Sequence, residues 1–142
     1  MSQPVVRRTE SEQEMLALGG ELAAQLQRGQ VVTLSGDLGA GKTTLVRGML
    51  RGLGFEGRVK SPSYGLVETY ELDELTVHHL DLYRLGDPGE LDFIGLEDLL
   101  GDDSVVLVEW PERAVGRLPR PDRRVSIEVD GCARRVGVVD RD

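Results

Sequence analysis

The sequence contains no asparagine, only one cysteine and only two lysines. Without asparagine the chain lacks the Asn-Lys-x-Asp motif with which GTPases read guanine. A single cysteine, Cys132, excludes an internal disulfide bond. No apolar run approaches the roughly 20 residues of a membrane-spanning helix. The first residues also lack the apolar core of a signal peptide, and we therefore expect a cytoplasmic protein without a membrane partner.

Acidic residues outnumber basic ones, with 25 Asp and Glu against 17 Lys and Arg. The net charge at pH 7 is −8, whereas proteins that hold nucleic acid by themselves usually carry a basic patch. We therefore expect the chain not to bind RNA or DNA alone, while a basic surface of a partner protein remains compatible with it. The length of 142 residues suits one domain spanning 1–142.

Residues 36–43 read GDLGAGKT and match the phosphate-binding P-loop pattern G-x-x-x-x-G-K-[ST] in full. Glycines let backbone N–H groups surround a phosphate, and the helix that follows presents its positive N-terminus to the same group. We therefore predict ATP with Mg²⁺ as the ligand, because the missing asparagine favours adenine over guanine. The predicted phosphate-binding residues are Gly36, Asp37, Leu38, Gly39, Ala40, Gly41, Lys42, Thr43 and Thr44.

The sequence around this motif has the context that a P-loop requires. An apolar strand is predicted at Val31–Ser35 and an amphipathic helix at Lys42–Leu53, closed by Gly54. An earlier helix follows Ser11, whose spacing to Glu14 is that of a capping box, and Gly29 is placed to end it. The apolar face of that helix comprises Met15, Leu18, Leu22 and Leu26.

The remaining pattern consists mainly of short strands. A polar stretch at 83–103 allows only short helices, and the Pro- and Gly-rich segment 111–123 is predicted as loop with one helical turn. The fold prediction is therefore α/β, a P-loop NTPase-like three-layer domain with a mixed β-sheet and a C-terminal β-hairpin. The predicted strands are 5–8, a hairpin of Tyr64–Leu72 and Leu75–Leu82 turning at Asp73-Glu74, Val105–Glu109, and a hairpin of Val125–Val129 and Arg134–Val139 around Asp130-Gly131.

Two acidic residues end apolar strands. Asp81 ends VHHLD and Glu109 ends VVLVE, and ligands of open α/β sheets bind at the carboxyl ends of the strands. A P-loop enzyme needs a carboxylate near its magnesium and a group that orients water, so both acids are candidate site residues. His79 shares a strand face with Asp81 and is either a site residue or a half-buried strand histidine. Trp110 either packs near the nucleotide or fills the edge of the core.

Other functions remain open at this point. A small-molecule kinase would use an arginine-rich lid, although the chain is short and offers no obvious pocket for an acceptor. An interaction module that binds ATP without hydrolysing it is a further alternative. The arginines available for a lid are Arg113, Arg117, Arg120, Arg123 and Arg124.

A series of motifs along the chain resembles the TsaE (YjeE) family. GDLGAGKTT is followed by SPSY, by H-x-DLYR from His79, by L-x-x-I-G-x-E-D from Leu91, and by VEWPER, which contains Glu109 and ends at Arg113. The resemblance implies a bacterial ATPase that is needed to make the tRNA base threonylcarbamoyladenosine. It implies the TsaB–TsaD complex as partner, with tRNA met only through that complex. ATP hydrolysis then supports repeated turnover and is not itself the threonylcarbamoyl transfer.

The resemblance also implies roles for individual residues. Lys42 would act on the phosphates and Thr43 on Mg²⁺, while Asp81 and Glu109 would form the metal and water site. Ser63 stands where many family members have threonine, and it keeps the hydroxyl that Mg²⁺ needs.

The resemblance further suggests where the base of the nucleotide lies. Similar proteins place adenine between the N-terminal segment near Glu12 and the C-terminal hairpin near Arg134. Trp110 follows the acidic residue as it does in the family, and we count it with Glu12 and Arg134 among the nucleotide-binding residues.

Overall fold

A seven-stranded mixed sheet forms the centre of the computed structural model, which describes all residues except 1–4, 61, 63–65, 74, 102 and 142. The strands lie in the order β1-β7-β6-β2-β5-β4-β3. Their bounds are β1 Val5–Thr9, β2 Val31–Ser35, β3 Val67–Glu71, β4 Thr76–Asp81, β5 Ser104–Glu109, β6 Arg123–Asp130 and β7 Ala133–Asp140.

The four central strands, β6, β2, β5 and β4, run parallel to one another. Hairpins add an antiparallel strand at each side: β3 pairs with β4, and β7 pairs with β6 and with β1. Strands β2 and β5 carry near-continuous apolar runs, as expected of parallel strands that are covered on both faces. The carboxyl ends of these four strands therefore meet at one edge of the sheet.

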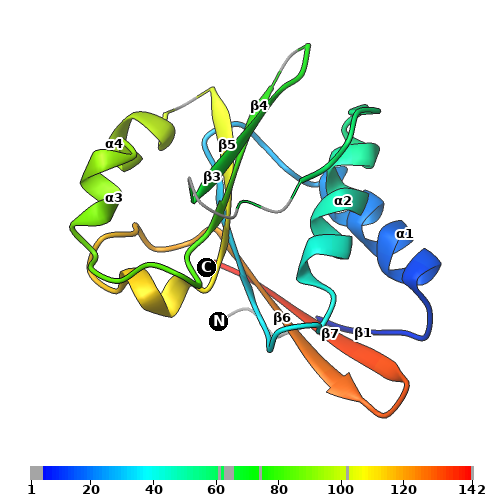
Figure 1. Ribbon diagram of the computed structural model, residues 1–142. Coiled ribbons are helices and arrows are strands. Elements are labelled where there is room, and N and C mark those ends of the chain that lie inside the picture. Colours follow the sequence, from blue (N-terminus) through cyan, green and yellow to red (C-terminus); the bar gives the residue numbers. More distant parts are fainter. Residues whose placement is uncertain (1–4, 61, 63–65, 74, 102, 142) are drawn as a thin grey trace.

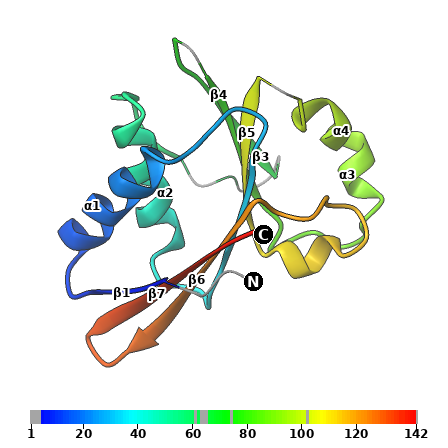
Figure 2. The ribbon, with the colours of Figure 1, turned by 180° about the vertical axis from the view of Figure 1, so that it is seen from behind.

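Helices cover the sheet on both faces, which gives three layers (Figure 1). Helices α1 (Glu12–Ala23) and α2 (Lys42–Gly52) lie on one face. The short helices α3 (Glu90–Phe93) and α4 (Leu96–Leu99) and the 3₁₀ helix η1 (Pro111–Ala114) lie on the other, as the reverse view also shows (Figure 2). In the described part of the chain, no helix combines the length and the apolar composition needed to cross a membrane.

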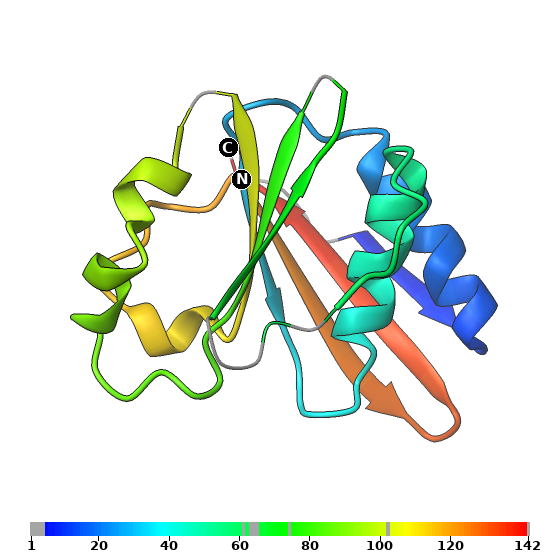
Figure 3. The same cartoon turned by 45° about the horizontal axis from the view of Figure 1, so that its top comes forward.

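Each face of the sheet has its own apolar core. Alternate residues of one strand point to opposite faces, so Leu107 packs toward α1 and α2 while Val106 and Val108 pack toward α3, α4 and η1. In the view along the layers the sheet separates the two groups of helices (Figure 3). A residue's place in this alternation consequently decides which layer its side chain meets.

Glycines allow α1 and α2 to pack closely. A Cβ atom added to Gly19 would lie 2.5 Å from the carbonyl oxygen of Leu45, and one added to Gly48 would overlap the carbonyl oxygen of Leu16. Real side chains do not approach backbone atoms so closely, so both positions require glycine. This contact sets where α2, and with it the P-loop, stands relative to α1.

The structure confirms the predicted fold and most of the predicted elements. Strand β2, helix α2 and both hairpins form where the pattern placed them, with small shifts at the ends. Ser11 accepts a hydrogen bond of 3.1 Å from the N–H of Glu14, as the capping pattern predicts. The carboxylate of Glu14 in turn accepts from the N–H of Glu10, one residue before the cap. The predicted start of the first hairpin at Tyr64 and residue 74 of its predicted turn lie outside the described residues.

The predicted end of the first helix was wrong. Helix α1 stops at Ala23, and its chain continues in tight turns in which Leu26 donates to the carbonyl of Ala23. Leu26 still packs against the core from this turn, so it satisfies the apolar periodicity without being helical. Gly29, with a φ of 85°, serves the later turn into β2 and not a helix end.

Candidate functional site

The P-loop connects β2 to α2 at the carboxyl edge of the sheet. Gly41 is the N-cap of α2 and has a φ of 114°, a conformation that side chains disfavour. Gly36 has a φ of 154°, and a Cβ atom there would lie 2.7 Å from the carbonyl oxygen of Ile127. Asp37, Leu38 and Gly39 are exposed at the tip of the loop. The glycines of the motif therefore fix the path of the loop and the start of the helix.

Lys42 is buried at the first turn of α2, with 5% of its surface exposed. Its Nζ donates a 2.5 Å hydrogen bond to the carbonyl oxygen of Gly36 and lies 3.8 Å from the centroid of the Trp110 ring. Burial lowers the pKa of Lys42, although the negative charges of Glu109 and Asp81 oppose this. The loop thus holds one ammonium group close to the place where the P-loop pattern predicts the phosphates.

Trp110, which the sequence left between two interpretations, packs against Lys42. It has a φ of 59° and stands at the sharp turn between β5 and η1. Its other neighbour is Tyr83, whose ring centroid lies 5.1 Å away. Trp110 is therefore a wall of the P-loop site, and it also contacts the core on the α3, α4 and η1 face.

Asp81 and Glu109 lie side by side at the ends of β4 and β5. The two strands are parallel, and the register pairs Asp81 directly with Glu109. Asp81 points to the same face as Val77 on β4, and Glu109 points to the same face as Leu107 on β5, because side chains alternate along a strand. Val77 and Leu107 pack toward α1 and α2. The two carboxylates consequently share the face of the sheet from which α2 and Lys42 rise.

The two acids differ in their surroundings. Asp81 is half-buried, and its Oδ1 accepts a 3.1 Å hydrogen bond from the N–H of Tyr83. Burial raises the pKa of Asp81, with a further contribution from the negative charge of Glu109, while the Tyr83 N–H and Lys42 act in the opposite direction. Glu109 is buried, with 3% of its surface exposed.

His79 contacts Glu109 directly. The Nε2 atom of His79 lies 2.6 Å from Oε2 of Glu109, and both side chains are buried. His79 is thus no half-buried strand histidine but a neighbour of a candidate site residue. The signal for this contact in the sequence is weak: the His-x-Asp spacing puts His79 and Asp81 on one strand face, but it says nothing about the partner strand.

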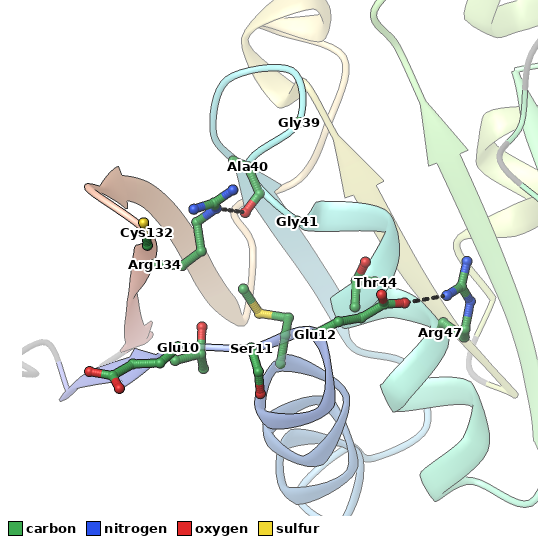
Figure 4. A pocket seen from close by; sticks show the side chains of 12 residues that line it. Glu10, Ser11, Glu12, Gly39, Ala40, Gly41, Thr44, Arg47, Cys132 and Arg134 are labelled. Atoms are coloured by element: carbon green, nitrogen blue, oxygen red, sulfur yellow. Dashed lines mark hydrogen bonds and ion pairs between the residues drawn. The ribbon is translucent and has the colours of Figure 1, made fainter.

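A second part of the site is a cavity of about 300 Å³ beside the P-loop. Figure 4 shows it between the start of α1, the end of the P-loop, the first turns of α2 and the hairpin of β6 and β7. It brings Glu12 and Arg134 together with Gly39, Ala40, Gly41 and Thr44. Residues 12 and 134 of the sequence therefore meet at one cavity, next to the P-loop.

Two polar contacts hold the walls of this cavity. Arg134 donates from Nε to the carbonyl oxygen of Ala40 over 3.0 Å, and Arg47 donates from Nη1 to Oε1 of Glu12 over 3.2 Å. The first joins the C-terminal hairpin to the P-loop, and the second joins α2 to α1. Sequence reasoning missed Arg47, whose only signal is its position one helical turn after Thr44 on α2.

A model of the family "Threonylcarbamoyl adenosine biosynthesis protein TsaE" matches residues 9–136 of the chain. The chain belongs to the TsaE family. The described site residues from Glu12 to Arg134 all fall within the region that the TsaE model matches.

Known TsaE proteins and a solved structure agree with this assignment. The chain is 46% identical to the tRNA threonylcarbamoyladenosine biosynthesis protein TsaE of Haemophilus influenzae over 88% of this chain and 82% of that protein. It is 36% identical to the protein of that name from Bacillus subtilis, over 90% and 80% of the two chains. The crystal structure of B. subtilis YdiB superposes with a TM-score of 0.81 at 31% identity, over 99% of this chain and 87% of that one.

The remaining residues suggested by the TsaE resemblance lie in different places. Thr43 follows Lys42 in the first turn of α2 and is half-buried. Ser63 lies outside the described residues. Among the residues that the structure describes, no group of three or more His, Cys, Asp or Glu side chains is arranged to hold a metal ion.

The arginines considered for a kinase lid are divided between different contacts. Arg117 pairs with Asp92 at 3.0 Å and Arg123 with Asp140 at 2.5 Å. The Cζ atom of Arg113 lies 5.9 Å from the centroid of the Tyr83 ring. Two of these arginines pair with carboxylates away from the P-loop, and this favours a structural role for them over a place in a lid.

Proposed function

We propose that this chain binds ATP with Mg²⁺ and hydrolyses it as the ATPase component of tRNA threonylcarbamoyladenosine synthesis. The observation that carries the proposal is the meeting of Lys42, Asp81 and Glu109 where the P-loop, β4 and β5 end on one face of the sheet. A positive group and two carboxylates at this edge are the parts that P-loop phosphoryl transfer requires.

ATP binding is supported by the P-loop and by the cavity beside it. The phosphates would lie against the loop N–H groups and the N-terminus of α2, with Lys42 neutralising negative charge and Thr44 contacting the α-phosphate. The base would occupy the cavity of about 300 Å³ between Glu12 and Arg134. This arrangement accounts for a cavity continuous with the end of the P-loop, which phosphate binding alone does not need.

The residues present fit Mg²⁺. Magnesium prefers oxygen ligands and commonly takes one or two from protein, with the rest from substrate phosphates and water. The Thr43 hydroxyl and the Asp81 carboxylate are such ligands on neighbouring elements, and Glu109 and Ser63 are further oxygen donors suggested by the family resemblance. Bound there, Mg²⁺ would neutralise phosphate charge; a cluster of three carboxylates is not needed for this role.

Hydrolysis requires a group that orients the attacking water. Glu109 suits this role because it ends a buried strand beside Asp81, on the face of Lys42. A carboxylate in this place can accept a hydrogen bond from water and direct its lone pair toward the γ-phosphate. Asp81, the carboxylate paired with Glu109 at this edge, is then left for the magnesium ion.

The pathway and the partner come from the family. Curated TsaE proteins carry threonylcarbamoyladenosine biosynthesis in their names, and the family resemblance implies the TsaB–TsaD complex as partner. We propose that this chain joins that complex and that its ATP hydrolysis supports repeated turnover. The net charge of −8 is compatible with contact to a basic protein surface, with tRNA held by the partners.

The test measures ATP hydrolysis by the chain alone and with TsaB–TsaD, together with tRNA modification over one and over many turnovers. We expect weak hydrolysis alone, stimulation by the partners, and a need for this chain only when many turnovers are required. If the chain alone hydrolyses ATP at its full rate and TsaB–TsaD does not change that rate, the proposal is contradicted. Transfer of phosphate to a small acceptor would establish the kinase alternative.

A third outcome concerns the module that binds without hydrolysis. Glu109→Ala is expected to abolish hydrolysis while ATP binding, measured by calorimetry, survives. Absence of hydrolysis by the wild-type chain with its partners, in the presence of ATP binding, would leave only the interaction module.

A further inference from the structure

We infer that His79 is a positioning residue that holds the Glu109 carboxylate in its working orientation. The inference rests on the proposed function, since it gives His79 a role through the water-orienting role of Glu109. It assigns a purpose to a buried histidine that neither the P-loop nor the predicted magnesium ligands explain.

The contact between the two side chains is short and fully enclosed. Nε2 of His79 and Oε2 of Glu109 are 2.6 Å apart, with 0% of the His79 side chain and 4% of the Glu109 side chain exposed. The residues are 30 positions apart in sequence and stand on adjacent parallel strands. In the register His79 is opposite Leu107, and Glu109 is opposite Asp81, so the Glu109 side chain reaches back along the strands to His79.

The role proposed for Glu109 sets the direction of the hydrogen bond. A carboxylate that orients water is ionised and can only accept, so in that role the proton of this contact is on Nε2 of His79. The Nδ1 atom of His79 is buried without a hydrogen-bond partner among the residues that the structure describes. Among the described residues the His79 ring therefore has this one polar contact, and the buried side chains around it supply the rest of its environment.

A fixed donor changes what Glu109 can do. A glutamate side chain at the end of a strand has several rotamers, and locking it costs entropy that a single buried hydrogen bond offsets. With Oε2 held by His79, the other oxygen, for which the described residues provide no hydrogen-bond donor, stays available for water. Positioning of this kind matters because a displacement of about 1 Å can cost roughly 100-fold in rate.

The chain contains a natural control. Its only other histidine is His78, whose side chain points to the opposite face of β4. The Nδ1 atom of His78 lies 2.9 Å from Oγ1 of Thr69. His78 belongs to the same strand and has the same chemistry, but it does not contact the two carboxylates. A change at His78 tests the effect of altering a β4 histidine as such.

The experiment compares four variants with wild type in single-turnover ATP hydrolysis with protein in excess: His79→Leu, His79→Gln, His78→Gln and Glu109→Gln. Leucine removes the donor and keeps the bulk, whereas the glutamine amide can still donate to Glu109. We expect His79→Leu to lower the hydrolysis rate by about 10- to 100-fold, the range associated with a misplaced catalytic group. His79→Gln should lose much less, and His78→Gln should match wild type. ATP affinity by calorimetry should remain within about twofold, because uniform binding is not affected.

The double variant His79→Leu/Glu109→Gln separates positioning from general support of the fold. If His79 acts only through Glu109, its loss adds no further decrease to that of Glu109→Gln. A further decrease of tenfold or so, or an equal loss in His79→Leu and His79→Gln when both are folded by circular dichroism, would overturn the inference. So would unchanged or faster hydrolysis by His79→Leu.

Failure of the proposed function looks different. If Glu109→Gln hydrolyses ATP like wild type, Glu109 has no role in turnover and both the proposal and this inference fall. If Glu109→Gln is inactive and His79→Leu is fully active, only the inference falls. Should His79→Leu not fold, the comparison of His79→Gln with wild type still decides, since retained activity is required of it.

Discussion

Arg134 on β7 donates a hydrogen bond of 3.0 Å to the carbonyl oxygen of Ala40 in the P-loop, across 94 residues of sequence. Arg134 lies two residues before Val136 on the same strand, so both side chains point to the same face of the sheet. Val136 packs toward α1 and α2, and Arg134 therefore faces the P-loop side. The contact joins the last hairpin of the chain to the loop at its centre. The cavity proposed for adenine depends on this connection, because its two sides come from opposite ends of the sequence.

Replacing Arg134 is expected to weaken ATP binding. Arg134→Gln removes the bond that ties β7 to the P-loop and with it one wall of the cavity proposed for the base. A loss of about 1.4 kcal/mol in contacts to the base lowers affinity about tenfold, and we expect a decrease of that order. Calorimetric titration with ATP and Mg²⁺ measures this. The control is Arg135→Gln, because Arg135 is the next residue of β7 and is exposed. Equal affinities in both variants would contradict the place that we propose for the base.

Replacing Lys42 is expected to abolish ATP binding and turnover. Its ammonium group is buried between the carbonyl oxygen of Gly36 and the Trp110 ring, beside the proposed phosphate site. Lys42→Ala removes that charge, and we expect ATP affinity to fall by roughly 100-fold, as loss of two buried charged interactions suggests. Lys60→Ala, at the only other lysine and at an exposed position, is the matched control. Unchanged ATP binding in Lys42→Ala by calorimetry would refute the P-loop assignment.

We expect the ionised carboxylate of Asp81 to destabilise the fold when neither nucleotide nor Mg²⁺ is bound. Because burial raises the pKa of Asp81, the folded state binds its proton more tightly than the unfolded chain does, so the ionised form lowers the free energy of unfolding at pH 7. Asp81→Asn should therefore raise the unfolding temperature at pH 7 without nucleotide or Mg²⁺. The gain should shrink as the pH falls through the raised pKa toward the ordinary carboxyl range.

Thermal unfolding followed by circular dichroism between pH 7 and pH 4 measures this effect. The exposed Glu97→Gln serves as control, because it also removes one carboxylate. A lower unfolding temperature of Asp81→Asn at pH 7 would show that the charge of Asp81 stabilises the fold. ATP hydrolysis should fall in Asp81→Asn in either case, which separates stability from function.

The packing of α1 on α2 predicts a difference between two glycine substitutions. A Cβ at position 48 would overlap the carbonyl oxygen of Leu16, whereas one at position 20 has no atom nearer than 4.0 Å. Overpacking costs about 1–3 kcal/mol, so Gly48→Ala should lower the free energy of unfolding and displace the helix that carries Lys42. Gly20→Ala should be neutral or stabilising by up to about 1 kcal/mol, because alanine favours helix. Urea unfolding compares them, and equal stability of the two variants would contradict the tight packing at Gly48.

Features that depend on neighbours in sequence could be predicted from the sequence. The P-loop is one contiguous motif, and the apolar runs before and after it predicted β2 and α2 within a residue. Asp81 and Glu109 could be singled out because each ends an apolar strand. The hairpin around Asp130-Gly131 followed from its turn residues, and Gly131 indeed has a φ of 62°.

Local pattern was insufficient where packing decided. Leu26 continued the periodicity of α1 but lies in a turn after Ala23, because an apolar side chain can fill the core from either conformation. His79 remained undecided, because its partner stands on another strand. The requirement for glycine at position 48 was also invisible, since it arises from a backbone atom of a different helix.

The sequence by itself determined that the chain carries a P-loop motif, an α/β fold and two acids at strand ends, because each of these is a short-range pattern. The tertiary structure alone decided which distant residues meet: His79 with Glu109, Arg134 with Ala40, and Lys42 with Trp110. The physical reason is that strand order and register set these distances, and they result from the packing of two layers of helices on one sheet. Sequence motifs identify the residues of the candidate site, and the register of β4 with β5 brings its two carboxylates, Asp81 and Glu109, together.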